Sequence, residues 1–330
     1  MQKNWERCLK EAYAADAKVR GKRNRSIKLP SGITFVGEGE QVQLVLSAKC
    51  VTANMQADAA AFEGWCLALR RWCKVEIELR WTPPPPDAPK SHRRHYERFL
   101  YRAARFQTLF DWFRIESDCA VEVGKARALE QRPLFLNVGG PRGFEKEGAS
   151  DGDSESALEH RLLKSSAFAE HYGFANGTRD RQLPVGLFSG TVSRKSQIFP
   201  GGKGAIDLGC LDADTLWLFE LKAGENIPVG AITELFFYTS VVRDALGGGP
   251  FEFAQALPKA RIQYKALSKV TRIEGAMLGH DVHPLIESGL ISIMNEAVEN
   301  RWNAEPSRPQ VHFRADRIVE EPELKIASVD

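Results

Sequence analysis

Residues 204–222 read GAIDLGCLDADTLWLFELK, and this stretch decides how the second half of the chain folds. Two apolar runs flank residues 212–215, whose small and polar side chains predict a tight turn, so the stretch predicts a β-hairpin. A turn centred in those four residues places Asp207 directly opposite Glu220. Side chains opposed on one sheet face have Cβ atoms roughly 5 Å apart, so we expect the two carboxylates to repel each other.

The second strand of this hairpin has apolar side chains on both faces, as in a strand that is buried on both sides. Burying an unpaired carboxylate costs several kcal/mol, and Lys222 supplies one positive charge against two acids. A divalent cation with oxygen ligands would supply the rest. Alternation divides the strand into two faces, with Leu216, Leu218, Glu220 and Lys222 on one and Trp217, Phe219 and Leu221 on the other.

This pattern, Asp207 on one strand and Glu220-Leu221-Lys222 on the next, resembles the signature of the PD-(D/E)XK phosphodiesterase superfamily. The proline that the family places before its first acid is absent, and Ile206 stands there instead. Such a motif needs its structural context, because acid-x-Lys alone is weak evidence. Two further matches in this chain, residues 16–18 and 323–325, do not follow a hairpin with an opposed acid.

The segments on either side of the hairpin extend the resemblance to about residues 150–285. Upstream, residues 154–163 predict a serine-capped helix, and Glu155 or Glu159 matches the glutamate that the family carries there. Downstream, Glu234 and Tyr238 match the Glu or Gln and the Tyr of the next helix. Tyr238 by itself is more typical of a core aromatic than of a site residue.

The resemblance implies a metal-dependent nuclease that hydrolyses phosphodiester bonds, of DNA rather than RNA, by one-step attack of a metal-activated water. It implies Mg²⁺ or Mn²⁺ as cofactor and a setting in restriction, repair or anti-phage defence. The metal ligands it implies are Asp207, Glu220 and the backbone carbonyl of Leu221, and the catalytic residues are Asp207, Glu220, Lys222, Glu234 and either Glu155 or Glu159.

Three other functions stay open at this point. The first is a non-catalytic nucleic-acid-binding or assembly subunit that retains the nuclease fold. The second is a metallohydrolase centred on His280, Asp281 and His283, residue types that bind transition metals, although a polar loop after a strand is the simpler interpretation. The third is a structural protein. No Cys-x-x-Cys pair occurs, so we do not expect a structural zinc site.

Length and composition suggest two domains in 330 residues. No apolar run is long enough to span a membrane, and the first residues lack the apolar core of a signal peptide, so we expect a cytoplasmic protein. Residues 1–150 hold 26 Lys and Arg against 18 Asp and Glu, whereas residues 151–330 hold 19 against 25. A basic half beside an acidic half with a metal site suits a polyanionic substrate.

The fold that we expect is α/β, with a mixed β-sheet flanked by helices as in restriction endonucleases, and a separate N-terminal α+β domain. The N-terminal domain would cover residues 1–140 and bind substrate or a partner, and the nuclease domain would cover 150–330. A homo-oligomer or a larger complex is compatible with this arrangement. The residues expected to contact nucleic acid are Lys203, Arg93, Arg94, Arg98 and Arg102.

Hydrophobic spacing also predicts the individual elements. The first 25 residues predict a basic helix ending at residues 22–25, and Phe62, Trp65, Leu69 and Trp72 predict a core stripe. The other predicted elements are a helix at 91–113, strands within 121–138, a helix at 154–171, a helix at 229–246, a strand at 272–278, a helix at 284–300 and a strand at 311–319.

Overall fold

The hairpin lies inside a six-stranded mixed sheet in the second half of the chain. The computed structural model describes residues 3–22, 25–129, 133–137, 154–200, 204–224, 227–254, 262, 264–320 and 324–329. The sheet has the order β13-β12-β11-β9-β8-β6, in which β9, β11 and β12 are parallel and the other neighbours are antiparallel. Its strands are β6 (Thr178–Pro184), β8 (Ala205–Asp212), β9 (Thr215–Lys222), β11 (Arg272–Gly279), β12 (Gln310–Glu320) and β13 (Lys325–Ser328).

The register of the hairpin is the predicted one. Asp212 pairs with Thr215, so the turn consists of Ala213 and Asp214, and Ala213 has a φ of 51°. A positive φ is unusual for a residue with a Cβ and is tolerated at hairpin turns. Pairing continues to Leu208 and Phe219, so Asp207 and Glu220 are the next two residues along their strands.

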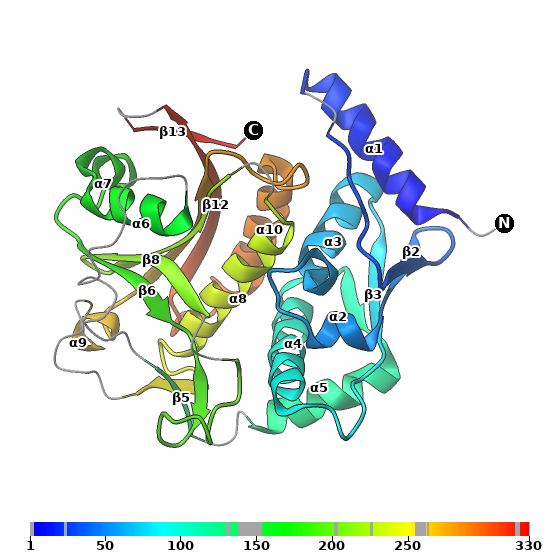
Figure 1. Ribbon diagram of the computed structural model, residues 1–330, viewed down its shortest axis with the longest axis horizontal. Helices are drawn as coiled ribbons and strands as arrows, with labels where there is room; N and C mark the ends of the chain where they lie inside the picture. The colour runs from blue at the N-terminus through cyan, green and yellow to red at the C-terminus, as the bar shows by residue number, and fades with distance from the viewer. Residues whose placement is uncertain are drawn as a thin grey trace.

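Helices cover both faces of this sheet, which explains why β9 is apolar on both sides (Figure 1). Helices α8 (Gly230–Asp244) and α10 (Ser288–Arg301) connect the parallel strands and cover the face of Leu216 and Leu218. Helices α6 (Glu155–Lys164) and α7 (Ser166–Tyr172) cover the opposite face, where Trp217, Phe219 and Leu221 join a second apolar cluster. The predicted assignment of residues to the two faces is therefore confirmed.

The first half of the chain forms a four-stranded sheet of order β1-β2-β3-β4 with helices around it. The predicted core stripe is confirmed, because all four of its side chains are buried. The elements are α1 (Trp5–Val19), β1 (Ile33–Val36), β2 (Gln41–Leu46), α2 (Ala48–Thr52), α3 (Phe62–Ala68), β3 (Glu76–Trp81), α4 (Lys90–Leu109), β4 (Phe113–Ile115) and α5 (Ser117–Leu129), with single helical turns at Asp58–Ala60 and Leu69–Cys73.

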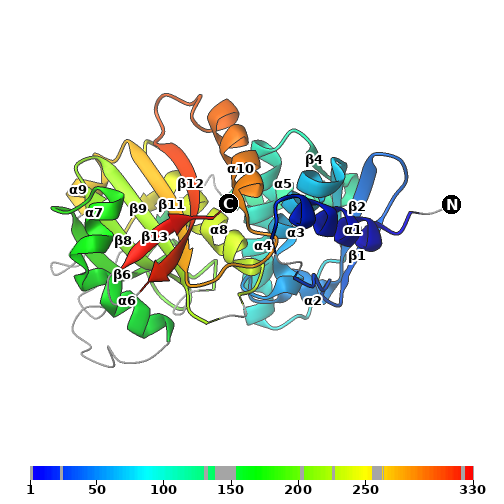
Figure 2. The same cartoon turned by 90° about the horizontal axis from the view of Figure 1, so that it is seen from above.

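The two halves share one continuous hydrophobic core. Helices α8 and α10 lie between the six-stranded sheet and helices α3 and α4 (Figure 2). A buried ion pair lies at this boundary, where Nε of Arg102 donates to Glu63 at 2.7 Å. The hydroxyl of Thr233 on α8 donates to the same carboxylate at 3.0 Å, and this hydrogen bond joins the two halves. The predicted division near residues 140–150 lies outside the described residues, so the separate N-terminal domain stays a prediction.

Several predicted elements differ from the structure: the first helix ends at Val19 rather than at 22–25, and the helix predicted at 91–113 ends at Leu109, with Phe113 already in β4. The described residues within 121–138 do not form a run of strands: α5 extends to Leu129, and β5 (Leu134–Leu136) is a short strand. The predicted helix at 154–171 is divided at Ser165, whose hydroxyl accepts from the backbone N–H of Phe168 and caps a second helix. The remaining elements are β7 (Leu187–Ser189), β10 (Phe251–Phe253) and α9 (Tyr264–Leu267), and β10-β5-β7 form a third, small sheet.

Among the described helices, none combines the length and the apolar composition that crossing a lipid bilayer requires.

Candidate functional site

Asp207 lies where the two strands of the hairpin stop pairing. Its Oδ2 accepts a hydrogen bond of 2.7 Å from the backbone N–H of Leu221, so a carboxylate takes the place of the carbonyl that a continuing strand would supply. In an antiparallel pair the N–H and C=O of one residue point to the same side. The carbonyl of Leu221 therefore points toward the same gap between β8 and β9.

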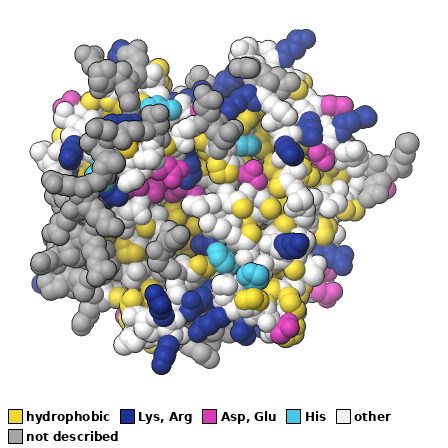
Figure 3. Space-filling model, viewed as in Figure 1, with side chains coloured by type: hydrophobic (Ala, Val, Ile, Leu, Met, Phe, Trp, Pro, Cys, Tyr) yellow, Lys and Arg dark blue, Asp and Glu magenta, His cyan; other side chains and the backbone are white. Residues whose placement is uncertain are grey.

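Lys222 brings three carboxylates from three elements together. Its Nζ lies 2.6 Å from Oε1 of Glu220 on β9, 3.2 Å from Oε2 of Glu234 on α8 and 3.6 Å from Oε1 of Glu155 on α6. Lys222 and Glu220 are 6% and 2% exposed, whereas the Glu155 side chain is about half exposed. In Figure 3, Asp and Glu side chains gather left of centre, over the region where Figure 1 draws α6 and β8.

Burial and charge compete in setting the protonation of this group. Burial alone would lower the pKa of Lys222, but the carboxylates of Glu220, Glu234 and Glu155 outweigh it, so the pKa is raised and the ammonium persists. Burial raises the pKa of Glu220 well above its usual value, and the negative charges of Asp207 and Glu234 add to the effect. The site therefore contains more acid than its one lysine can balance.

Burial and charge also compete in setting the pKa of Asp207. Burial raises its pKa to about 7, although the ammonium of Lys222 and the N–H of Leu221 both act in the opposite direction. Asp207 is therefore partly protonated at neutral pH while no other cation is present. A cation bound between Asp207 and Glu220 would replace that proton.

Both predicted glutamates of α6 lie at the site, in different roles. Glu155 reaches Lys222, whereas Glu159 is buried and is held by Nε of Arg181 at 3.0 Å and by Nε2 of Gln182 at 2.7 Å. Burial raises the pKa of Glu159 in spite of these partners.

The sequence did not indicate Gln182, and the structure explains why. Gln182 has a φ of 55°, and the pairing of β6 with β8 skips this residue, between Arg181–Leu208 and Leu183–Ile206. With this irregular backbone, the side-chain amide of Gln182 points toward Glu159. A left-handed backbone at a non-glycine residue is a form of strain that clusters at functional sites, but the one-dimensional pattern of residues does not reveal it.

Glu234 is fixed from its own helix. The hydroxyl of Tyr238, one turn later on α8, donates to Oε1 of Glu234 at 3.2 Å, while Oε2 faces Lys222. Both side chains are buried. Tyr238 therefore supports the site through Glu234 as well as belonging to the core.

The donor atoms at this site fit a hard cation. Oε2 of Glu220 is buried without a hydrogen-bond partner among the described residues. Across the part of the chain that the structure describes, no three His, Cys, Asp or Glu side chains form a metal-binding group. Mg²⁺ commonly takes one or two carboxylates and completes its shell with water. The donors available for it are the carboxylates of Asp207 and Glu220 and the carbonyl of Leu221.

The predicted nucleic-acid contacts on α4 require correction. Arg98 and Arg102 are 3% and 2% exposed, because their face of α4 packs against the core. Arg102 pairs with Glu63, and Arg98 donates to the side-chain oxygen of Asn54. Neither can face a nucleic acid.

The other predicted contacts differ in their surroundings. Arg93 is exposed, and Arg94 is half-buried and donates to the backbone carbonyl of Arg194. Lys203 lies outside the described residues.

The segment with His280, Asp281 and His283 is held by other interactions. Asp281 accepts from Nη1 of Arg25 at 2.6 Å, and Nδ1 of His283 accepts from the backbone N–H of Leu285 at 3.2 Å. No metal-binding group involves these residues within the described ranges. The simpler interpretation, a structured polar loop after β11, accounts for the contacts.

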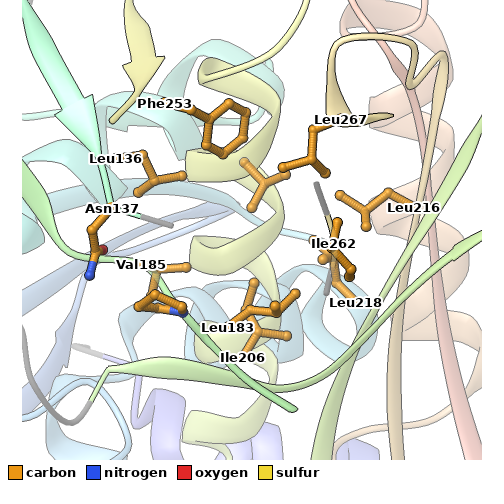
Figure 4. Close-up of a pocket in the computed structure, with 12 residues that line it drawn as sticks. Leu136, Asn137, Leu183, Val185, Ile206, Leu216, Leu218, Phe253, Ile262 and Leu267 are labelled. Atoms are coloured by element: carbon orange, nitrogen blue, oxygen red, sulfur yellow. The ribbon is translucent and has the colours of Figure 1, made fainter. Parts of the chain in front are cut away.

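A separate cavity of about 50 Å³ lies among β6, β8, β9 and the small third sheet. Figure 4 shows leucine, isoleucine, valine and phenylalanine side chains pointing into it, with Asn137 at one side. This lining offers no acid or base.

Comparison with known proteins identifies no relative of this chain, so the site is described by its own residues alone. The chain matches no protein-family model, no curated protein and no solved structure.

Proposed function

We propose that this protein is a metal-dependent nuclease of the restriction-endonuclease-like type, which hydrolyses phosphodiester bonds of DNA. The observation that carries the proposal is the contact of Lys222 with Glu220, Glu234 and Glu155, beside Asp207, at the point where β8 and β9 separate. These residue types are the ones that metal-assisted phosphodiester hydrolysis requires.

The residues of the chain would divide the work as follows. Asp207, Glu220 and the Leu221 carbonyl would hold Mg²⁺ or Mn²⁺, which when bound polarises the phosphate and acidifies a water. Lys222 keeps its proton and directs an ammonium at the attacking water or the phosphate, where negative charge grows as the bond to the leaving oxygen breaks. Glu234 restricts the position of Lys222.

The test is nicking of supercoiled plasmid with Mg²⁺ or Mn²⁺, by the wild type and by Lys222→Met. The expected result is nicking by the wild type and loss of nicking, with metal binding retained in calorimetry, for Lys222→Met. Lys265→Met, which changes an exposed lysine on α9, is the matched control and should leave nicking unchanged. Because Lys222 is buried among acids, circular dichroism must establish that Lys222→Met is folded.

A non-catalytic nucleic-acid-binding subunit is the second candidate, favoured by one observation. Lys222 already occupies Oε1 of Glu220 at 2.6 Å, so the site is neutralised in part by its own lysine. That candidate predicts binding of nucleic acid without nicking over a panel of single-stranded and double-stranded DNA and RNA.

A further inference from the structure

The first turn of α8 is capped by a residue from the other half of the chain. Val229 stands at the N-cap of this helix and makes no side-chain hydrogen bond to it. The backbone N–H of Val229 donates instead to Oδ1 of Asp58 at 2.8 Å, and the two residues are 171 positions apart in the sequence. Asp58 therefore does for α8 what a polar N-cap residue does for an ordinary helix.

This cap completes the hydrogen bonding of the backbone N–H groups that a helix leaves free at its start. The N–H groups of Ala231 and Ile232 donate to carbonyls three residues back, each at 3.2 Å, and such bonds tighten the first turn. The N–H groups at positions 229 and 230 are the ones that Asp58 binds, and their hydrogen bonds oppose the rise that burial causes in the pKa of Asp58. All four donors of the first turn are thereby satisfied, two of them by Asp58.

Two close contacts hold the same turn of α8 against the first half of the chain. A Cβ at Gly230 would lie 2.2 Å from the carbonyl oxygen of Gln56, and a Cβ at Gly64 on α3 would lie 2.6 Å from Cγ2 of Val229. Helices α3 and α8 accordingly lie side by side in both views (Figures 1 and 2). A turn packed this closely has little room to shift as long as its cap is present.

The capped turn leads directly into the part of α8 that reaches the candidate site. Thr233 donates to Glu63 of the first half, and the next residue, Glu234, lies 3.2 Å from Nζ of Lys222. In an α-helix the N–H of residue 234 bonds to the carbonyl of residue 230. A displacement of the first turn would therefore pass to Glu234 and change its distance from Lys222.

We propose that Asp58 is a positioning residue for the proposed nuclease. By capping α8 it fixes Glu234, and through Glu234 it fixes the ammonium of Lys222 that faces the attacking water or the phosphate. This inference rests on the proposed function. It also gives the first half of the chain a part in the active site, because that half supplies the support for the helix that orients the lysine.

The experiment measures kcat and KM for plasmid nicking in Asp58→Ala, Asp58→Asn and Ser165→Ala. Asp58→Ala removes the cap, and we expect kcat to fall roughly 10-fold or more with KM unchanged, because Asp58 acts on an orienting residue and not on the substrate. Asp58→Asn keeps an oxygen acceptor and should restore kcat, since asparagine caps helices as well as aspartate does. Ser165→Ala is the matched control, because it removes the side-chain cap of α7, a helix outside the candidate site.

A double-mutant cycle separates positioning from a contribution to stability alone. If Asp58 acts through Glu234, Asp58→Ala should lower kcat strongly in the wild type and hardly further in Glu234→Gln, because residues that act as a unit are not additive. Three results would overturn the inference: the same fold-loss of kcat in both backgrounds, equal losses in Asp58→Ala and Ser165→Ala, or no recovery in Asp58→Asn.

The same cycle is measured by urea denaturation in EDTA, which needs no activity. Absence of nicking by the wild type would contradict the proposed nuclease. Free energies of unfolding that are not additive for Asp58→Ala and Glu234→Gln would then still support the link between the two residues, whereas additive ones would overturn it.

Discussion

Nζ of Lys222 lies 3.2 Å from Oε2 of Glu234, so the last residue of β9 is tied to the helix that follows it. A buried lysine between two buried glutamates has little freedom to move. The ammonium is therefore held in one orientation before any substrate arrives, as preorganised electrostatic catalysis requires.

Changing Glu234 to Gln should test this positioning role. The amide keeps the size of the side chain and an oxygen for the Tyr238 hydroxyl, but it removes the charge that holds Lys222. We expect kcat for plasmid nicking to fall roughly 10- to 100-fold, as for other residues that orient a catalytic group. Glu296→Gln, at an exposed site on α10, is the control. An unchanged kcat in Glu234→Gln would mean that Lys222 needs no such partner.

Asp207 predicts a pH dependence of stability in the metal-free protein. Its pKa is raised from 3.8 to about 7 in the folded state, so the folded protein holds this proton more tightly than the unfolded chain does. The contribution of Asp207 to the free energy of unfolding is present in full below about pH 4 and is lost as pH rises through about 7.

Asp207→Asn removes this titration. At pH 8 in EDTA, urea denaturation should find the variant more stable than the wild type by about 2 kcal/mol, a value reduced for the partial exposure of Asp207. At pH 4 the two proteins should be alike. Mg²⁺ should stabilise the wild type at pH 8 and not the variant, because an ion that binds the folded state stabilises it. Equal stabilisation of both proteins by Mg²⁺ would remove Asp207 from the proposed metal site.

The pKa of His283 predicts that stability depends on pH in the opposite direction. Burial and the nearby Arg25 lower its pKa from 6.5 to about 4, and its Nδ1 must stay unprotonated to accept from Leu285. The stability from this site is complete above about pH 6.5 and is lost as pH falls through about 4, by about 2 kcal/mol.

His283→Asn offers a carbonyl oxygen in place of Nδ1 and cannot titrate in this range. Thermal or urea denaturation from pH 7 to pH 4 should therefore show a smaller loss of stability in the variant. His92→Asn changes an exposed histidine on α4 and should follow the wild type. If His283→Asn and the wild type lose stability in parallel, the buried imidazole is not the cause.

The packing of the two halves should be sensitive at Gly230. A Cβ there would lie 2.2 Å from the backbone oxygen of Gln56, and backbone cannot move aside as a flexible side chain can. We expect Gly230→Ala to destabilise the protein by about 1–3 kcal/mol. In Gly124→Ala the new Cβ meets no described atom within 4 Å, and alanine in helix α5 should stabilise by about 0.5–1 kcal/mol. A stable Gly230→Ala would show that the halves can separate at this contact.

Much of the candidate site could be predicted from local sequence because a hairpin is a local structure. The position of the turn and the alternation of side chains set the register of β8 and β9, and with it the opposition of Asp207 and Glu220. Helical spacing then placed Glu234 and Tyr238 on one helix. Glu155 and Glu159 could not be separated in this way, since both lie on α6 and their roles depend on what β6 presents to them.

The arginines of α4 show where this reasoning fails. Spacing placed Arg98 and Arg102 on one side of the helix, and their charge suggested solvent or a polyanion. The residues that bury them, Glu63 and Asn54, lie far away in the sequence. A helix pattern gives the direction of a side chain relative to its own axis, but it does not give the identity of the neighbour.

The sequence by itself determined the hairpin, the two faces of its second strand and the opposition of Asp207 and Glu220 beside Lys222, because these follow from bonds and alternation within a few residues. The tertiary structure decided which α6 glutamate reaches the lysine, that Gln182 holds the other, and that the end of α1 lies beside the carboxyl edge of the sheet. These relationships join segments whose separation in the chain carries no information about their distance in space, so packing alone could set them.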